Sequence, residues 1–216
     1  MRSRRRCVVA LAAGMAALAA GRPASGAAAA PAEALAARLR QRLSDAPVQR
    51  GQFEQRKTVA GFKHPLVSRG DYLFARERGV VWRTREPFAS TLVLTRDRLV
   101  SRTDDGRGGT PAADTQQSPA LRAVNGLMFA LLAADLAALG ERFRIDGEVP
   151  AQGTWRLVLT PRDAALGAWI QHIELQGDRQ VQAVQWREPS GDETHLRLSG
   201  QSTAVQLDRD EAARFE

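Results

Sequence analysis

Two long stretches of this chain alternate apolar and polar residues, and this pattern constrains the fold more than any other feature. The first stretch covers residues 49–103 and the second covers residues 142–200. Within them, apolar residues recur two positions apart, as at Leu92 and Leu94, while polar or charged residues stand between them. A period of two is typical of β-strands that bury one face. The chain is therefore predicted to be mainly β.

Short turn-like sequences divide these stretches into strands. Examples are Gly61, Glu86-Pro87 and Asp178. Connections this short join antiparallel neighbours, because a parallel pair needs a crossover of about a dozen residues or more. The predicted strands are 49–58, 67–76, 80–85, 90–95, 98–103, 142–149, 154–160, 168–176, 180–188 and 193–200.

Two helical segments are predicted outside the strands. Residues 31–44 carry a leucine at every fourth position, which is typical of an amphipathic helix. Residues 118–139 are rich in alanine and leucine, so these short helices should be buried on more than one side, as a core plug or as a lid over a cavity. Residues 104–117, with three glycines and Pro111, are predicted to be a loop. About ten antiparallel strands around one helical insert favour a strongly curved sheet or a partly closed barrel.

The N-terminus has the layout of a secretory signal peptide. Four arginines lie within the first six residues, and an uncharged apolar run follows from Cys7 to Ala20. A run of about 14 residues is too short for a membrane anchor, since a spanning helix needs about 20. We expect cleavage near Gly26 or Ala27 after export by the general or the twin-arginine route. The predicted organisation is a cleaved signal at 1–26 and one domain at 27–216, located in the periplasm without stable membrane insertion.

Cysteine content and charge limit the possible functions. Cys7 is the only cysteine and would leave with the signal, so the exported domain would have no disulfide, thiol nucleophile or thiolate ligand. The net charge of +7 is also partly a property of the signal, because residues 1–26 contain five arginines and no acidic residue. The other basic residues form no stripe of the kind that nucleic-acid binding needs.

No pattern of catalytic residues is present. The three histidines, His64, His172 and His195, are scattered and lack metal-ligand spacing. The sequence also lacks a nucleophile elbow and a glycine-rich phosphate loop after a strand. We therefore predict a protein that is not an enzyme and that needs neither a metal nor a cofactor.

Several segments, taken in order, resemble the LolA family of periplasmic lipoprotein carriers. The resemblance covers about residues 33 to 215, and its strength lies in the order and spacing of the motifs. The matching segments are Gly51-Gln52-Phe53-Glu54-Gln55, Ser68 to Arg76, Val81-Trp82 through Glu86-Pro87, Thr91 to Asp97, Leu157 to Pro161, and Ile170 to Trp186.

The resemblance implies an unclosed antiparallel β-barrel of about 10 or 11 strands, with an N-terminal helix and a short helical lid. It further implies a monomeric carrier that holds the acyl chains of a lipoprotein or another acylated envelope lipid. An inner-membrane exporter would supply this cargo, and an outer-membrane acceptor would receive it. A related half-barrel in the stress sensor RseB leaves a second possibility, a lipid-sensing signalling protein.

The strand alternation and the family pattern together predict an apolar lipid cavity. Its predicted lining is Phe53, Tyr72, Phe74, Val80, Trp82, Leu92, Leu94, Met128, Leu131, Leu132, Trp155, Leu157, Ile173, Leu175 and Trp186. The resemblance also implies that Arg76 is a latch that holds the empty lid shut. Its guanidinium would donate hydrogen bonds to carbonyl groups at the helix C-termini within residues 118–139.

Overall fold

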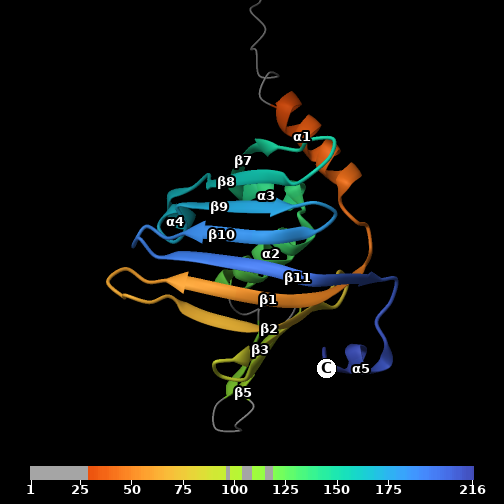
Figure 1. Cartoon of the computed structure of the whole chain (residues 1–216), viewed down its shortest axis with the longest axis vertical. Coiled ribbons are helices and arrows are strands. Elements are labelled where there is room, and N and C mark those ends of the chain that lie inside the picture. Colours follow the sequence, from red (N-terminus) through yellow and green to blue (C-terminus); the bar gives the residue numbers. More distant parts are fainter. Residues whose placement is uncertain (1–28, 96–97, 104–108, 115–118) are drawn as a thin grey trace, which may run out of the picture.

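The computed structural model describes residues 29–95, 98–103, 109–114 and 119–216, and its main feature is one large antiparallel sheet (Figure 1). The sheet has eleven strands in the order β6-β5-β4-β3-β2-β1-β11-β10-β9-β8-β7. The strands are β1 (Val48–Thr58), β2 (Leu66–Ala75), β3 (Gly79–Glu86), β4 (Ser90–Thr95), β5 (Arg98–Thr103), β6 (Gly109–Asp114), β7 (Phe143–Glu148), β8 (Trp155–Pro161), β9 (His172–Gly177), β10 (Val181–Arg187) and β11 (Glu193–Ala204). The helices are α1 (Ala29–Arg42), α2 (Pro119–Ala133), α3 (Leu136–Arg142), α4 (Ala164–Gly167) and α5 (Arg209–Ala213).

The first and last strands meet in the middle of the sheet. β1 pairs with β2 on one side and with β11 on the other, and all pairings are antiparallel. The sheet therefore ends at β6 on one edge and at β7 on the other, and α2 and α3 lie between these two strands in the sequence. In Figure 1 both helices lie behind the broad face made by β1 and β7–β11. The predicted mainly β, unclosed sheet is confirmed.

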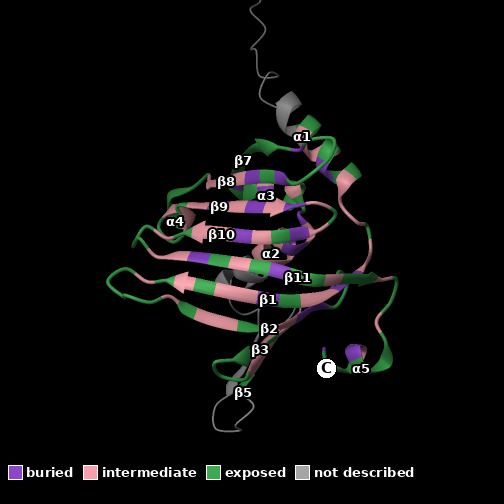
Figure 2. Cartoon of the chain, in the orientation of Figure 1, coloured by how far each residue is buried: buried purple, intermediate pink, exposed green. Residues whose placement is uncertain are grey.

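Residues alternate between two faces along the strands, as the period of two predicts. We call the face that packs against α2 and α3 the inner face and the opposite one the outer face. In β8 the residues Trp155, Leu157 and Leu159 are fully buried on the inner face, while Arg156 between them is exposed. Buried and exposed positions follow each other in the same way along neighbouring strands (Figure 2).

A small apolar cluster also covers part of the outer face. It contains Val48, Leu73, Ala75, Val81 and Val93 from the sheet, and Phe215 from the segment that follows α5. The helix α5 begins with a capping box, in which the Asp208 carboxylate accepts from the backbone of Glu211 and the Glu211 carboxylate accepts from the backbone of Asp208. The end of the chain thus packs against the outside of the sheet.

Three predictions from the sequence need correction. Residues 109–114 are not a loop but the edge strand β6. This strand pairs with β5 although its sequence has no apolar alternation that would predict a strand. Pro111 within it is compatible with an edge position, where one side of the strand has no ladder partner. The strand predicted at 168–176 starts only at His172, because residues 164–167 form α4 with Asp163 as its cap. The last strand also continues to Ala204 instead of ending at residue 200.

The N-terminal helix is confirmed, and it is fixed to the rest of the molecule by both apolar and polar contacts. Leu39 is fully buried in the inner face, and Leu35 and Leu43 pack beside it. Arg42 donates to the carbonyl oxygens of Pro150 and Gly153 at 2.8 and 2.7 Å, and it also pairs with Asp178. Among the described residues, no helix has both the length and the apolar character needed to cross a membrane. The predicted signal at 1–26 lies outside the described residues.

Candidate functional site

The inner face forms one continuous apolar cluster that the helices cover. We call it the inner cluster. It brings together all the predicted lining residues except Leu92, which is half-buried and lies outside the cluster. Ten of these residues are buried: Phe53, Tyr72, Phe74, Val80, Leu94, Leu132, Trp155, Leu157, Ile173 and Leu175. Trp82, Met128, Leu131 and Trp186 are half-buried and pack against them.

An aromatic group occupies the part of the inner face formed by β1, β2 and β3. The rings of Phe53 and Trp82 stack with centroids 4.0 Å apart, and the centroids of Tyr72 and Trp82 are 6.0 Å apart. The Tyr72 hydroxyl oxygen accepts a hydrogen bond from Gln201 Nε2 at 2.8 Å. Burial raises the pKa of the Tyr72 hydroxyl, although the bond from Gln201 acts in the opposite direction. Tyr72 therefore stays neutral at physiological pH and adds apolar surface to this face.

The helix α2 contacts the inner face through apolar side chains. Leu127, Met128, Phe129, Leu131 and Leu132 all belong to or pack on the inner cluster. The ring of Phe129 lies edge-on to that of Phe74, with centroids 6.0 Å apart. From Gly126 to Ala133, where the side chains of α2 are described, no side-chain hydrogen bond or ion pair joins the helix to the sheet.

The next helix, α3, is held by polar contacts at both ends. Asp135 caps its first turn by accepting from the backbone amides of Ala137 and Ala138. At the other end, Arg162 Nε donates to the carbonyl oxygens of Gly140 and Phe143 at 3.0 Å each. Arg162 thus ties the end of α3 to the residue after β8, whereas the described side chains of α2 contact the inner face through apolar groups.

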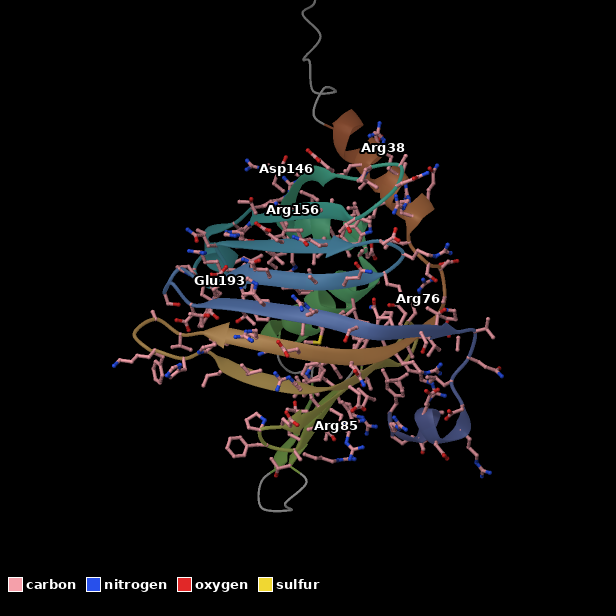
Figure 3. The ribbon with its side chains drawn as sticks, in the orientation of Figure 1. Arg38, Arg76, Arg85, Asp146, Arg156 and Glu193 are labelled. Atoms are coloured by element: carbon pink, nitrogen blue, oxygen red, sulfur yellow. The ribbon has the colours of Figure 1, made fainter. Side chains whose placement is uncertain are left out.

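The predicted latch residue has a different partner in this structure. Arg76 Nη1 donates to Asp45 Oδ1 at 2.8 Å, and the Arg76 side chain is about half exposed. Asp45 lies between α1 and β1, on the side of the molecule where Figure 3 places Arg76. None of the described carbonyl groups of α2 or α3 accepts a hydrogen bond from Arg76. The latch therefore stays a prediction, and this structure adds Asp45 as its observed partner.

Several buried members of the inner cluster are not among the residues predicted to line the cavity. Leu39, Leu139, Phe143, Leu159 and Val184 are all buried in it. Leu159 continues the alternation of Trp155 and Leu157, and Val184 alternates with Trp186, so the two-residue period places both on the buried face. By contrast, Leu139 and Phe143 lie at the junction of α3 and β7, where neither a helical nor a strand period extends far enough to assign a face.

Metal ligands do not gather in the described part of the chain: there, no three side chains of His, Cys, Asp or Glu could hold one ion together. His64 is exposed, His172 lies in β9, and His195 in β11 lies 3.2 Å from Glu193. The three histidines are therefore spread over separate elements.

Comparison with known proteins supports the fold. A family model described as "Outer membrane lipoprotein carrier protein LolA-like" matches residues 28–215. Among solved structures, a DUF1329 family protein from Desulfovibrio piger is 11% identical with a TM-score of 0.50, and the match covers 87% of this chain and 96% of that one. No curated protein sequence gives a significant match.

Two further solved structures are similar at lower scores. A LolA superfamily protein from Nitrosomonas europaea is 10% identical with a TM-score of 0.42, and the match covers 83% of this chain and 96% of that one. A chain from the Pseudomonas aeruginosa MucA/MucB complex is 17% identical with a TM-score of 0.37, and the match covers 85% of this chain and 58% of that one. At these scores neither likeness supports a functional argument, so the signalling alternative stays a prediction.

Proposed function

This chain belongs to the outer membrane lipoprotein carrier protein LolA-like family, and we propose that it carries acyl chains on the inner face of its open sheet. The cargo is an acylated lipoprotein or another acylated envelope lipid. An inner-membrane exporter supplies it, and an outer-membrane acceptor takes it up. The protein acts as a periplasmic monomer that binds and releases its cargo without chemical change.

The observation that carries this proposal is the apolar attachment of α2. Where they are described, the side chains of this helix hold it on the inner face by contacts such as Phe129 with Phe74, without a directional bond to the sheet. Apolar burial is non-directional and depends mainly on the area removed from water. An acyl chain can therefore replace residues 126–133 of α2 on the same surface without leaving a described polar side chain unpaired. α2 is the lid in this proposal, and α3 with its polar ends is the fixed part.

Both the empty state, with α2 on the inner face, and the loaded state, with an acyl chain there, are stabilised by burial of apolar surface. Each methylene group that leaves water contributes about 0.8 kcal/mol, so a long acyl chain gains enough to compete with the side chains of one helix. Leu131 and Met128 leave the inner face when α2 moves, and the cargo covers the surface that they expose. Binding and release then depend on the difference between two similar apolar contacts, which suits a carrier that must give up its cargo.

A crosslink between lid and sheet tests this movement. We would replace Phe74 and Phe129 by cysteine in a Cys7→Ser background, and join the two thiols with a short bifunctional reagent. The crosslinked protein should lose affinity for a fluorescent fatty acyl probe by at least about tenfold. The same double variant without the reagent is the control, so both samples share any weakening of the core. Equal probe affinity in the two samples would contradict the movement of α2.

The proposed location has its own test. Export of this chain requires the segment 1–26 to act as a cleavable signal, which leaves residues 27–216 as a single domain. Mass spectrometry of the protein from the periplasmic fraction should find an N-terminus near Ala27. An intact Met1 terminus in the membrane fraction would contradict the proposed location, independently of the acyl-binding result.

A further inference from the structure

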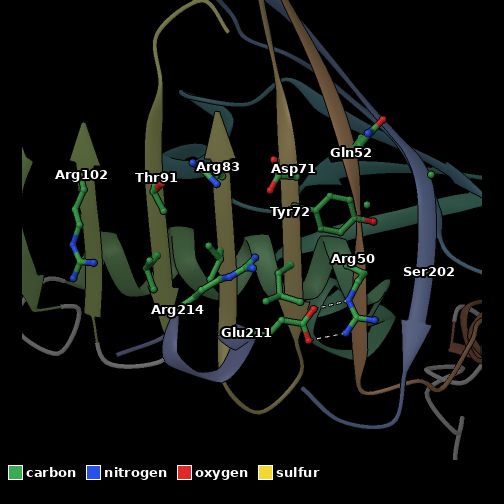
Figure 4. A pocket seen from close by; sticks show the side chains of 15 residues that line it. Arg50, Gln52, Asp71, Tyr72, Arg83, Thr91, Arg102, Ser202, Glu211 and Arg214 are labelled. Atoms are coloured by element: carbon green, nitrogen blue, oxygen red, sulfur yellow. Dashed lines mark hydrogen bonds and ion pairs between the residues drawn. The ribbon is translucent and has the colours of Figure 1, made fainter. Parts of the chain in front are cut away.

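The outer face has a hollow that is separate from the acyl-binding surface. It lies between the strands β1–β5 and β11 and the segment around α5, with a volume of about 520 Å³. Figure 4 shows its side chains, which come from the sheet strands, from α5 and from the residue after α5. This volume is within the range of about 300–1,000 Å³ that is usual for small-molecule sites. Because strand residues alternate, the inner cluster lies on the other side of the sheet, and Tyr72 is the one lining residue that also belongs to that cluster.

The acidic residues of this hollow already have partners. Glu211 accepts two hydrogen bonds from Arg50, both at 2.7 Å. Asp71 Oδ1 lies 2.6 Å from Nε of Arg85, which approaches it along the same face. The two negative charges in the lining are thus each balanced by a neighbouring arginine.

Two other arginines in the lining have no such partner. Arg102 at the end of β5 and Arg214 directly after α5 are both exposed, and neither side chain has a hydrogen bond or ion pair with any described residue. They come from segments more than 100 residues apart in the sequence, and both line the hollow. The hollow therefore has two available positive charges after its internal pairs are counted.

The floor of the hollow is apolar. Leu73, Val81 and Val93 are exposed to only 4 or 5% and form its base. The hydroxyl-bearing residues Thr91 and Ser202 also line it. A ligand that fits this arrangement has an anionic group for the arginines and a small apolar part for the floor.

We propose that this hollow binds an anionic ligand of the phosphate or carboxylate type, with Arg102 and Arg214 as the available positive groups of its lining. A guanidinium presents a planar fork of N–H donors that matches the oxygens of these anions, and its charge does not titrate at physiological pH. Both arginines lie on the face opposite the proposed acyl-binding surface, so the test of this site does not depend on acyl binding. The anion comes either from the free ion or from the headgroup of a membrane lipid, and both sources offer the same chemistry.

The test uses the full chain and two probes. Inorganic phosphate is titrated to measure free-ion binding, and flotation with vesicles of phosphatidylglycerol or of phosphatidylcholine measures headgroup binding. The variant is Arg102→Gln/Arg214→Gln, and the control is Arg38→Gln/Arg40→Gln, which removes the same charge from exposed positions on α1. Figure 3 shows Arg38 on α1, far from Arg85 on the outer face.

The proposal predicts that phosphate, or phosphatidylglycerol vesicles in preference to phosphatidylcholine, binds to the unchanged protein. Affinity should fall by at least about tenfold in the Arg102/Arg214 variant and by much less in the control. Binding of phosphate alone identifies a free anion, and binding of vesicles alone identifies a headgroup. Equal losses in variant and control would show a general charge effect and overturn the proposal, as would the absence of binding to both probes. Thermal unfolding should be unchanged in the variant, since neither arginine has a described partner.

Discussion

Arg50 and Glu211 form a two-fold hydrogen bond between residues that are 161 positions apart in the sequence. Arg50 Nε donates to Glu211 Oε1 and Arg50 Nη2 donates to Glu211 Oε2, both at 2.7 Å, which is the parallel geometry typical of a strong arginine–carboxylate pair. The Glu211 side chain is only 9% exposed, and that of Arg50 is one-third exposed. Through this pair β1 holds α5 on the outer face.

A second arginine fixes the residues that follow α5. Arg98 Nη2 donates to the carbonyl oxygen of Phe215 at 2.7 Å and also bonds to that of Glu216. Phe215 is buried in the small apolar cluster on the outer face of the sheet. The attachment of α5 therefore combines one apolar anchor with polar bonds from β1 and β5.

We expect Glu211→Gln to lower the free energy of unfolding by about 1.5–3 kcal/mol, the usual effect of losing a hydrogen bond to a charged group. The amide cannot accept from both donors of Arg50, and one of its own N–H groups would face the guanidinium. Urea unfolding measures the change. The control is Glu77→Gln, at an exposed residue of the β2–β3 turn that has no hydrogen bond or ion pair with any described residue. Equal stability of the two variants would contradict this role of Glu211.

The same pair predicts how stability depends on pH. The hydrogen bonds from Arg50 lower the pKa of Glu211 from its ordinary value of 4.5, although burial of the carboxyl acts in the opposite direction. A pKa that is lower in the folded state gives stability that is present above the unfolded value and is lost as the pH falls through the folded value. We therefore expect the stability difference between wild type and Glu211→Gln to be full near neutral pH and to shrink below pH 4.5.

Unfolding experiments at about pH 7 and about pH 3 check this prediction. The difference between the two proteins is the quantity to compare, because the pKa values of Glu54, Asp192 and Glu193 are also lowered and contribute to the acid sensitivity of both. A stability difference that stays constant over this range would show that ionisation of Glu211 is not involved.

The residues of the inner face could be predicted from the sequence, because the face that a strand residue occupies depends on local alternation. Trp155, Leu157 and Leu175 were predicted to line one face from strand alternation together with the family pattern, and all three are fully buried on the inner face. The period of two decides the face of a strand residue without any knowledge of the partner strand. The inner cluster was therefore largely predictable.

The outer face was not predictable in this way. The pairing of Arg50 with Glu211, and the presence of Arg102 and Arg214 in the lining of one hollow, depend on the return of the chain after β11. No local pattern encodes such contacts, since they are set by strand order and register over the whole sheet. The edge strand β6 was missed for a related reason, because Gly109, Pro111 and Ala112 have no strand preference and the strand forms by pairing with β5.

The role of Arg76 can be tested against that of its observed partner. As a latch, Arg76→Leu should retain an acyl probe longer, with an off-rate reduced by at least about threefold and little change in fold. If the side chain only pairs with Asp45, the exposed ion pair contributes about 0–1 kcal/mol, and the off-rate should not change. Stopped-flow release of a fluorescent acyl probe distinguishes these outcomes.

Two further variants complete the comparison. Asp45→Asn removes the observed ion pair and leaves Arg76 free to donate elsewhere, while Arg78→Leu removes a nearby exposed arginine of the same turn. The latch predicts a slower release for Arg76→Leu than for either of these variants. Identical off-rates for wild type and Arg76→Leu would rule out the latch.

Thr194 places a hydroxyl group in the apolar inner face. Its side chain is fully buried on β11, where it follows the same alternation as Leu196 and Leu198, and Oγ1 has no hydrogen-bond partner among the described residues. An unpaired buried hydroxyl costs about 1–3 kcal/mol. Thr194→Val keeps the branched shape and removes this group, so we expect it to raise the free energy of unfolding by about 1 kcal/mol.

The matched variant Thr194→Ser keeps the hydroxyl and removes the methyl group, so it should destabilise the protein by leaving a small cavity. Under the proposed function, the hydroxyl is available to donate to the ester carbonyl of an acylated cargo that enters the inner face. Thr194→Val should then be more stable than wild type and yet bind an acyl ester probe more weakly, while its affinity for a plain hydrocarbon probe is unchanged. Thermal unfolding and probe titration measure the two effects separately. A Thr194→Val variant that is less stable than wild type would mean that the hydroxyl already has a partner, and it would remove the reason to assign Thr194 to the cargo.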